Sequence, residues 1–210
     1  MARLFYGWTI ALSAMLVLLV TNGLIISGIR VFDTSLLETF GWSRGALTFR
    51  DFLTFAIAGA LGPLAGALAD RFGVKRLMYF GSTLLVVSLY AYSRLQSTVG
   101  LYAIHVTFAA VLASCGLIVS IMLVSRWFVA KRGTAIGLAV VGTSLGGMIF
   151  PPLGTHLIQT YGWRQAFVYE AIVPILLIVV IAVAIREFPA DKGLTALGAD
   201  QSSTGAASSS

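Results

Sequence analysis

The amino-acid sequence predicts an all-α membrane protein with six transmembrane helices. Of its 210 residues, 58% are hydrophobic and only 10% are charged, whereas a soluble domain carries about 25% charged residues. The mean hydropathy of +0.93 indicates that lipid is the solvent for most of the surface. The apolar residues also form six separate runs, each close to the roughly 20 residues that a helix needs to cross a bilayer.

The first apolar run has only Arg3 ahead of it among charged residues, as a signal peptide can have. It is longer than the apolar core of about 7–15 residues in a signal peptide, and no clear cleavage site follows it. We therefore expect it to remain as an uncleaved span. The other five runs are separated by short loops that hold most of the Lys and Arg residues. The predicted spans are, in chain order, residues 8–29, 46–69, 77–93, 101–124, 133–157 and 163–185.

The loop charges predict the orientation in the membrane, because the side richer in Lys and Arg is normally cytoplasmic. This distribution explains the net charge of +6 without a nucleic-acid partner. Both termini are then cytoplasmic, and we expect a plasma membrane, in bacteria the inner one. The richer side receives Arg3, Arg71, Lys75, Arg76, Arg126, Lys131, Arg132, Arg186 and Lys192, and the other side receives Arg30, Arg44, Arg50, Arg94 and Arg164.

The C-terminal segment changes in composition. Pro189 and Gly193 block helix continuation, and residues 201–210 are almost entirely Ser, Ala, Gly and Thr, a composition typical of flexible linkers. We therefore divide the chain into a six-helix bundle over residues 1–187 and a flexible cytoplasmic tail over residues 188–210. Such a linker is expected to lead to a second domain.

A charged, glycine-marked turn separates the second and third spans. Residues 66–76 read GALADRFGVKR and resemble the loop between helices 2 and 3 of major facilitator superfamily transporters, G-x-L-A-D-R-x-G-R-K/R-R. Only Val74 departs from that pattern. The resemblance implies the N-terminal six-helix half of a twelve-helix transporter, built as an inverted 3+3 repeat. The matching residues are Gly66, Leu68, Asp70, Arg71, Gly73, Lys75 and Arg76.

This turn has two interpretations. In the first, its basic residues only determine topology at the lipid headgroups. In the second, which the family resemblance favours, the turn is a gating loop in which Asp70 meets a partner half and accepts from Arg126 or Arg76. Gly66 and Gly73 would let the helices pack and turn tightly there.

An internal repeat agrees with the predicted topology. Pro63 and Gly73 are separated by the same number of residues as Pro152 and Gly162, and an Arg-Gly pair begins both the second and the fifth span. The first turn is predicted to be cytoplasmic and the second external. Two three-helix units would therefore be inserted in opposite senses.

A second resemblance lies between the fourth and fifth spans. Residues 127–133 read WFVAKRG and are followed by small residues at regular spacing, similar to monocarboxylate-transporter-like and oxalate/formate-antiporter-like carriers. The resemblance implies small organic anions such as monocarboxylates as substrates, with the main substrate-pairing basic residues in the second half. Small residues four apart let helices approach closely, either in static packing or at a moving interface. The glycines of this interface are Gly133, Gly137, Gly142, Gly146 and Gly147.

Polar residues inside the spans are costly in hydrocarbon, so they are candidate functional groups. Five of them fall in the outer third of the membrane, either as an ion network that ties helices together or as an anion-attracting vestibule with proton-linked groups. Arg50, Asp51 and Glu170 are assigned to this external network. In the superfamily, helices 1 and 4 line the central cavity. Arg30 and His105, the other two outer residues, belong to these helices, so the resemblance favours a role in transport for them. The candidate cavity residues are Asn22, Gly23, Arg30, Tyr102, His105 and Ser114.

Two of these cavity residues have a specific alternative. Asn22 can hydrogen-bond a carboxylate substrate or make an interhelical hydrogen bond, and Tyr102 can be a cavity donor or an interfacial aromatic residue. The single cysteine, Cys115, lies in an apolar run and permits no intrachain disulfide.

No nucleotide-binding loop, metal-ligand spacing or catalytic triad pattern is visible, so we expect neither an enzyme nor a cofactor or metal. We expect a secondary transporter that works by alternating access, with proton symport or anion antiport left open. The alternatives are an inactive fragment, a half-carrier that needs a second six-helix half from the same or a separate chain, or a carrier of another small solute.

Overall fold

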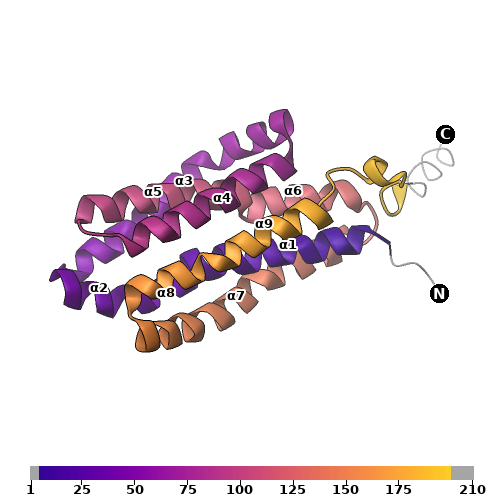
Figure 1. The fold of residues 1–210 in the computed structure, drawn as a ribbon. Coiled ribbons are helices and arrows are strands. Elements are labelled where there is room, and N and C mark those ends of the chain that lie inside the picture. The colour runs from indigo at the N-terminus through magenta and orange to yellow at the C-terminus, as the bar shows by residue number, and fades with distance from the viewer. Residues whose placement is uncertain (1–4, 200–210) are drawn as a thin grey trace, which may run out of the picture.

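The computed structural model describes residues 5–199, and all of its regular elements are helical (Figure 1). Five helical stretches of the described residues are long and apolar enough to cross a membrane: Gly7–Phe40, Arg44–Phe72, Thr98–Trp127, Arg132–Tyr161 and Trp163–Ala184. The helix α4 is not among them, although it contains 20 residues. Lys75, Arg76 and several Ser and Tyr residues make it less apolar. The elements are α1 Gly7–Asn22, α2 Asp33–Phe40, α3 Arg44–Phe72, α4 Val74–Ser93, α5 Thr98–Cys115, α6 Leu117–Trp127, α7 Arg132–Tyr161, α8 Trp163–Glu170, α9 Ile172–Ala184 and a final 3₁₀ turn, Pro189–Lys192.

The first span is longer than predicted. A π-helical turn, Gly23–Ser27, and a 3₁₀ turn, Gly28–Phe32, connect α1 directly to α2, so the helix continues to Phe40 rather than ending at residue 29. The charged residues Arg30 and Asp33 follow the predicted end of the span. In the fold both residues form ion pairs with residues of α3, and this pairing permits the helix to continue through them.

Two other predicted spans are interrupted. The fourth breaks between α5 and α6 at Gly116, where a Cβ would collide with the carbonyl oxygen of Leu112. The sixth breaks between α8 and α9 at Ala171. Pro174 has no N–H with which to bond the carbonyl of Glu170, which accounts for the second break.

The two longest helices end in the same way. Helix α3 has 29 residues with Pro63 inside it, and α7 has 30 residues with Pro151 and Pro152 inside it. Gly73 ends α3 at φ 92° and ψ 143°, and Gly162 ends α7 at φ 79° and ψ 157°. Positive φ favours glycine because an L side chain is strained there, so the matched glycines of the sequence repeat occupy matched turns.

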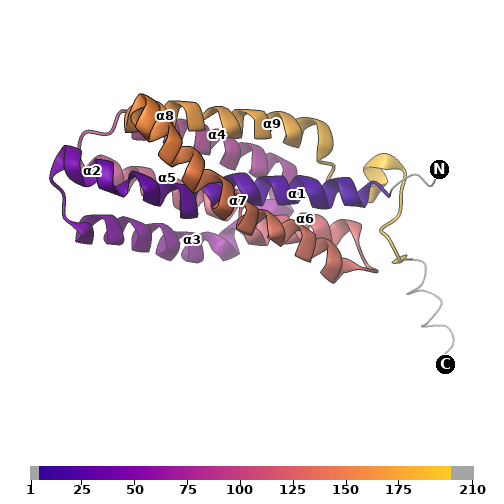
Figure 2. The ribbon, with the colours of Figure 1, turned by 90° about the horizontal axis from the view of Figure 1, so that it is seen from below.

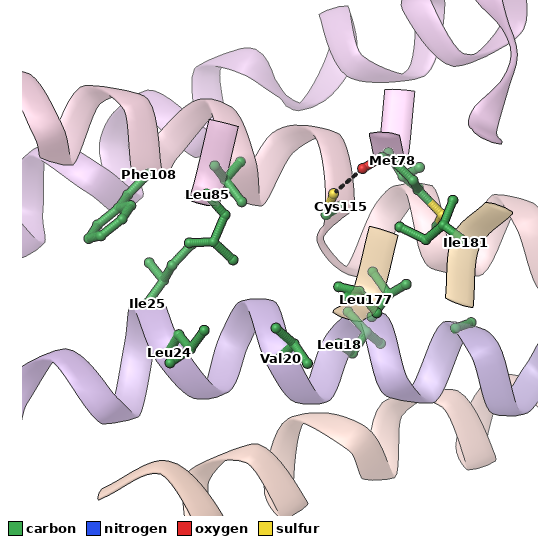
Figure 3. Packing of buried hydrophobic residues seen from close by; sticks show 14 of the residues in the cluster. Leu18, Val20, Leu24, Ile25, Met78, Leu85, Phe108, Cys115, Leu177 and Ile181 are labelled. Carbon is green, nitrogen blue, oxygen red and sulfur yellow. Dashed lines mark hydrogen bonds between the residues drawn. The ribbon is translucent and has the colours of Figure 1, made fainter. Parts of the chain in front are cut away.

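Helix α1 lies at the centre of the bundle. Its span is the most buried of the five, because 67% of its most apolar stretch is buried inside the fold. It packs against α7, α6, α9 and α5, while α3 packs on α5 at the opposite flank from α9 (Figure 2). Figure 3 shows the α1 side chains Leu18 and Val20 in the core that also holds Leu177 and Ile181 of α9. In that core the thiol of Cys115 donates to the carbonyl oxygen of Met78 at 3.3 Å.

Glycine brings α1 and α7 into backbone contact. A Cβ at Gly142 would meet the backbone of Met15, and one at Gly146 would meet the backbone of Leu19 and Gly23. Gly147 lies beside the side chain of Ser27. These three glycines therefore lie in packing contacts within the bundle. A Cβ at Gly133 or Gly137 would have no neighbour within 4 Å among the described residues.

The start of α1 and the end of α9 lie at the same end of the bundle. The hydroxyl of Tyr6 donates to the carbonyl oxygen of Ala184 at 2.9 Å. Of the segment expected to be a flexible tail, residues 188–199 are described, and Leu197 exchanges backbone hydrogen bonds with the loop after α6. The predictions for Arg3 and for residues 201–210 lie outside the described residues.

The glycine contact predicts a position-dependent effect of a single methyl group. Gly146→Ala should destabilise the bundle by about 1–3 kcal/mol, because overpacking forces the α1 and α7 backbones apart. Gly137→Ala is the matched control in the same helix and should be neutral or more stable by up to about 1 kcal/mol, since Ala is the better helix former. Reversible unfolding in detergent micelles measures both; equal effects would contradict the packing role of Gly146.

Candidate functional site

A buried arginine organises the first polar cluster. The side chain of Arg50 in α3 is 0% exposed, and its guanidinium donates from Nη2 to Asp33 Oδ1 of α2. It also donates from Nε to Asp51 Oδ1 at 3.3 Å and from Nη1 to the hydroxyl of Tyr92 in α4 at 3.1 Å. Arg30 adds a longer ion pair with Asp51, at 3.8 Å. The positive charge is thus compensated by two carboxylates, as burial of an ion requires.

The cluster continues as a directed chain of hydrogen bonds. Because arginine can only donate, the hydroxyl of Tyr92 accepts from Arg50, and its own proton points to His105 Nε2 at 3.3 Å. A neutral His105 with its proton on Nδ1 then donates to Thr54 Oγ1 at 2.8 Å. The hydroxyl of Thr54 donates in turn to the carbonyl oxygen of Arg50 at 3.0 Å. In this assignment each of the four hydrogen bonds has one donor and one acceptor.

Sequence reasoning found part of this cluster. It placed Arg30, Arg50, Asp51 and His105 in the outer third of the membrane, and the structure brings these four together. It also placed Glu170 there, but within residues 5–199 no hydrogen bond or ion pair joins Glu170 to them, and Glu170 Oε1 has no hydrogen-bond partner there. Sequence reasoning missed Asp33, Thr54 and Tyr92. Asp33 fell beyond the expected end of the first span, and a lone Tyr or Thr in an apolar helix gives no signal of its partner.

A second charged cluster lies at the other end of α3. Asp70 Oδ1 is 3.5 Å from Arg126 Nη2, and Arg126 Nη1 donates to Glu187 Oε2 at 3.5 Å. Arg126 is therefore the arginine that Asp70 pairs with, rather than the alternative, Arg76. The side chain of Asp70 is 71% exposed, whereas those of Arg126 and Glu187 are each 19% exposed. Asp70 can thus leave the cluster while the other pair remains.

Glu187 is the residue that sequence reasoning missed at this end. Its Oε1 accepts from the backbone N–H of Lys75 at 2.8 Å, and a Cβ at Gly73 would collide with its carboxylate. The turn therefore needs glycine at position 73 both for its positive φ and for the approach of Glu187. One sequence signal could have identified Glu187: it directly follows the last predicted span, on the side predicted to be cytoplasmic.

The other residues of the predicted gating loop make fewer contacts. Arg71 lies over the ring of Phe72 at 5.2 Å, and Arg76 is exposed. Gly66 was expected to bring helices together, but no described atom lies within 4 Å of the Cβ that could be built there. Among the described residues, Gly66 faces open space.

The candidate cavity residues near the middle of the bundle are mostly engaged in packing. Asn22 Nδ2 donates to Thr143 Oγ1 of α7 at 2.8 Å, which is the interhelical alternative. Gly23 lies against Phe150 and Gly146. The hydroxyl of Ser114 donates to the carbonyl of its own helix at Ala110, and the ring of Tyr102 contacts that of Phe49.

The structure contains an apolar groove of about 440 Å³ between α3, α4 and α5. Ser114 contributes to its wall, and the one charged residue in its lining is Arg76. Within residues 5–199, no group of three or more His, Cys, Asp or Glu side chains is placed to hold a metal ion.

Comparison with known proteins decides the family. The family model of the Major Facilitator Superfamily matches residues 4–206, nearly the whole chain. The chain belongs to the major facilitator superfamily. The resemblance of the turn at residues 66–76 to this family is thereby confirmed.

Several individual relatives of this chain are named as transporters. The riboflavin transporter RibJ of Trypanosoma brucei brucei is 29% identical over 167 residues, covering 77% of this chain and 30% of the relative. The oxalate:formate antiporter of Oxalobacter formigenes is 30% identical over 184 residues, covering 85% and 43%. Monocarboxylate transporter 11 of Mus musculus is 30% identical over 171 residues, covering 77% and 36%. The chain thus spans less than half the length of these relatives.

The hydrogen-bond chain from Arg50 to Thr54 predicts how much stability is lost when the hydroxyl of Tyr92 is removed. Tyr92→Phe leaves a buried donor of Arg50 and the acceptor nitrogen of His105 unpaired, and should lower the free energy of unfolding by about 1–3 kcal/mol. Tyr102→Phe is the matched control, because no hydrogen bond of the Tyr102 hydroxyl occurs within the described part of the chain; it should change stability by less than about 0.5 kcal/mol. Unfolding in detergent measures both, and indistinguishable values would refute the directed chain.

Proposed function

We propose that this chain forms the N-terminal six-helix bundle of a secondary transporter for small organic anions such as monocarboxylates, working by alternating access. The observation that carries this proposal is the pair of ion clusters at the two ends of α3. Arg50 and Asp70 are twenty residues apart in one helix, which is about 30 Å at a rise of 1.5 Å per residue. This separation matches the thickness of the hydrocarbon core.

The two clusters are suited to opening and closing opposite mouths. Each contains an arginine held by carboxylates from different segments: Arg50 by Asp33 and Asp51, and Arg126 by Asp70 and Glu187. An ion pair between segments can be made in one state and broken in the other, so it biases a two-state equilibrium. The mostly exposed Asp70 would exchange Arg126 for a group of a second bundle when the cytoplasmic mouth closes.

The second six-helix bundle is supported by the surfaces of α3 and α7. In this fold 22% of the most apolar stretch of α3 is buried, and 28% of that of α7. These are the two lowest values among the five spans. Their exposed apolar side chains include Phe52 and Phe55 on α3 and Met148 on α7. A second bundle, from the same or a separate chain, would cover part of this surface, and Gly66, Gly133 and Gly137 would then become close-contact positions.

The proposed bundle is an inverted repeat in which α4 serves as the third span. The matched turns at Gly73 and Gly162, and the proline-containing helices α3 and α7 before them, support this arrangement. The end of the bundle with Lys75, Arg76, Arg126 and Arg186 would be cytoplasmic by its positive charge. Both termini would lie there, residues 188–210 would form the cytoplasmic tail, and the membrane would be the bacterial inner membrane.

The substrate class rests on the relatives and on the basic residues. Two of the relatives described above are named for oxalate and formate or for monocarboxylates. The side chain of Arg30 is 61% exposed, so it is the accessible basic residue that would attract anions to the external mouth. A riboflavin transporter among the relatives makes riboflavin the second solute to test.

Proteoliposome uptake tests the function. The purified chain would be reconstituted alone and together with a six-helix second half, and supplied with labelled formate, oxalate, lactate or riboflavin. We expect uptake of a monocarboxylate only where two halves are assembled, as judged by cross-linking. Assembled pairs that take up none of the acids would refute the proposed substrate class, and uptake of riboflavin alone would reassign it.

The gating role of Asp70 predicts a loss of transport without a loss of insertion. In the assembled carrier, Asp70→Asn should reduce initial uptake at least several-fold, because the amide cannot form the ion pair with Arg126. Membrane insertion, measured from the amount of protein in washed membranes, should be unchanged. Glu38→Gln is the matched control, since Glu38 is exposed and makes no ion pair within residues 5–199. Unchanged uptake in Asp70→Asn would refute the gating role.

A further inference from the structure

Glu170 is a buried acid that the two charged clusters do not use. It is the last residue of α8, directly before the break at Ala171, and is only 2% exposed. Its Oε1 is buried and has no hydrogen-bond partner. The atom lies against α7, where a Cβ built on Gly154 would be 3.1 Å from it, and that same Cβ would be 3.0 Å from Val31 and 3.5 Å from Phe32 of the first span.

Among the described residues, no cation forms an ion pair with Glu170. Helices α7, α4 and α9 pack against α8, and α9 contains no ionisable residue. Each nearby ionisable side chain is engaged elsewhere or exposed. Arg30 forms an ion pair with Asp51, and Asp33 forms one with Arg50. Arg164 donates to the carbonyl oxygens of Ser93 and Leu95, and Arg94 donates to the hydroxyl of Tyr90. The hydroxyl of Tyr92 accepts from Arg50, and His156 is exposed.

An ionised carboxylate in this position would be an uncompensated charge inside a membrane-spanning bundle. Moving such a charge out of water costs far more free energy than moving the neutral acid, so the group takes up a proton instead. Ionisable residues that remain inside spans normally pair with each other or face a cavity. Glu170 forms no ion pair within residues 5–199, and its Oε1 lies beside Gly154, a position that Val31 and Phe32 of the first span also border.

We propose that Glu170 is a proton-binding site, held as a neutral carboxylic acid where the first span, α7 and α8 meet. The ligand is a single proton, and the site is separate from the hydrogen-bond chain of Arg50. The break at Ala171 and the absence of a side chain at Gly154 give the carboxyl group its place between the helices. The site rests on the membrane placement in the proposed function but on neither its substrate nor its gating.

A proton-binding site of this kind gives the bundle a group able to carry charge in a proton-coupled cycle. Release of the proton would leave a carboxylate that needs water or a cation, so deprotonation would favour a conformation in which α7 and α8 separate at Gly154. Proton binding and helix packing would thereby be linked, since a ligand shifts an equilibrium toward the state that binds it better.

Infrared spectroscopy of the full chain in lipid tests the proposal directly, without any transport measurement. A neutral carboxylic acid has a C=O stretching band that is distinct from the bands of a carboxylate. At neutral pH we expect such a band in the wild-type protein and its loss in Glu170→Gln, which preserves shape and neutrality. Glu38→Gln, which replaces an exposed acid that makes no ion pair within residues 5–199, is the control and should leave the band in place. An identical acid band in the wild type and Glu170→Gln would overturn the proposal.

A chemical measurement on the wild-type chain keeps the proposal testable if Glu170→Gln fails to fold. A hydrophobic carbodiimide takes the proton of a neutral carboxylic acid on one nitrogen, and the carboxyl oxygen bonds to its central carbon. The O-acylisourea then rearranges to an N-acylurea without a leaving group. We expect peptide mass spectrometry to find this adduct on Glu170, with less of it at higher pH. An adduct on Asp33 or Asp51 with none on Glu170 would contradict the proposal.

Discussion

The ion pair of Arg50 with Asp33 joins the first two spans and, with the second carboxylate from Asp51 of the same helix, determines how the outer end of the bundle is built. A fully buried guanidinium is tolerated only when carboxylates and other acceptors surround it. This requirement explains why the first helix continues to Phe40, since it must carry Asp33 to the buried face of α3. It also explains why Tyr92 of α4 and His105 of α5 follow in one hydrogen-bond chain. One charge therefore orders residues from four helical segments.

The opposite end uses the same principle with more freedom. Arg126 bridges Asp70 and Glu187, but Asp70 is mostly exposed, so its ion pair contributes little to stability in water. A weak contact of this kind suits a gate, because it can be exchanged at small cost. Between the two ends, α1 and α7 meet through glycine backbones and Asn22 bonds Thr143. The middle of the bundle is thus joined by close backbone packing, and its two ends are joined by charged clusters.

Family membership and the proposed mechanism stand on different grounds. The match over residues 4–206 establishes the superfamily, and the turn at residues 66–76 was the sequence feature that predicted it. The anion substrate and the second bundle rest on relatives that are more than twice as long as the matched region and on two helices with large exposed apolar faces. Glu170 adds a group whose chemistry is independent of both, because it depends only on burial without a cation.

The sequence by itself determined the class of the molecule, the approximate positions of its helical runs and the charged turn, because hydrophobic length and loop charge are local properties of the chain. It also predicted a polar group of residues near Arg50. Only the tertiary structure decided that Asp33, Tyr92 and Thr54 complete this group, that Glu187 joins Asp70 and Arg126, and that Glu170 stands apart. It also divided the glycine stripe into packed and open positions. Such pairings depend on how helices far apart in the chain are rotated against each other, and a pattern along one helix carries no information about its partner's face.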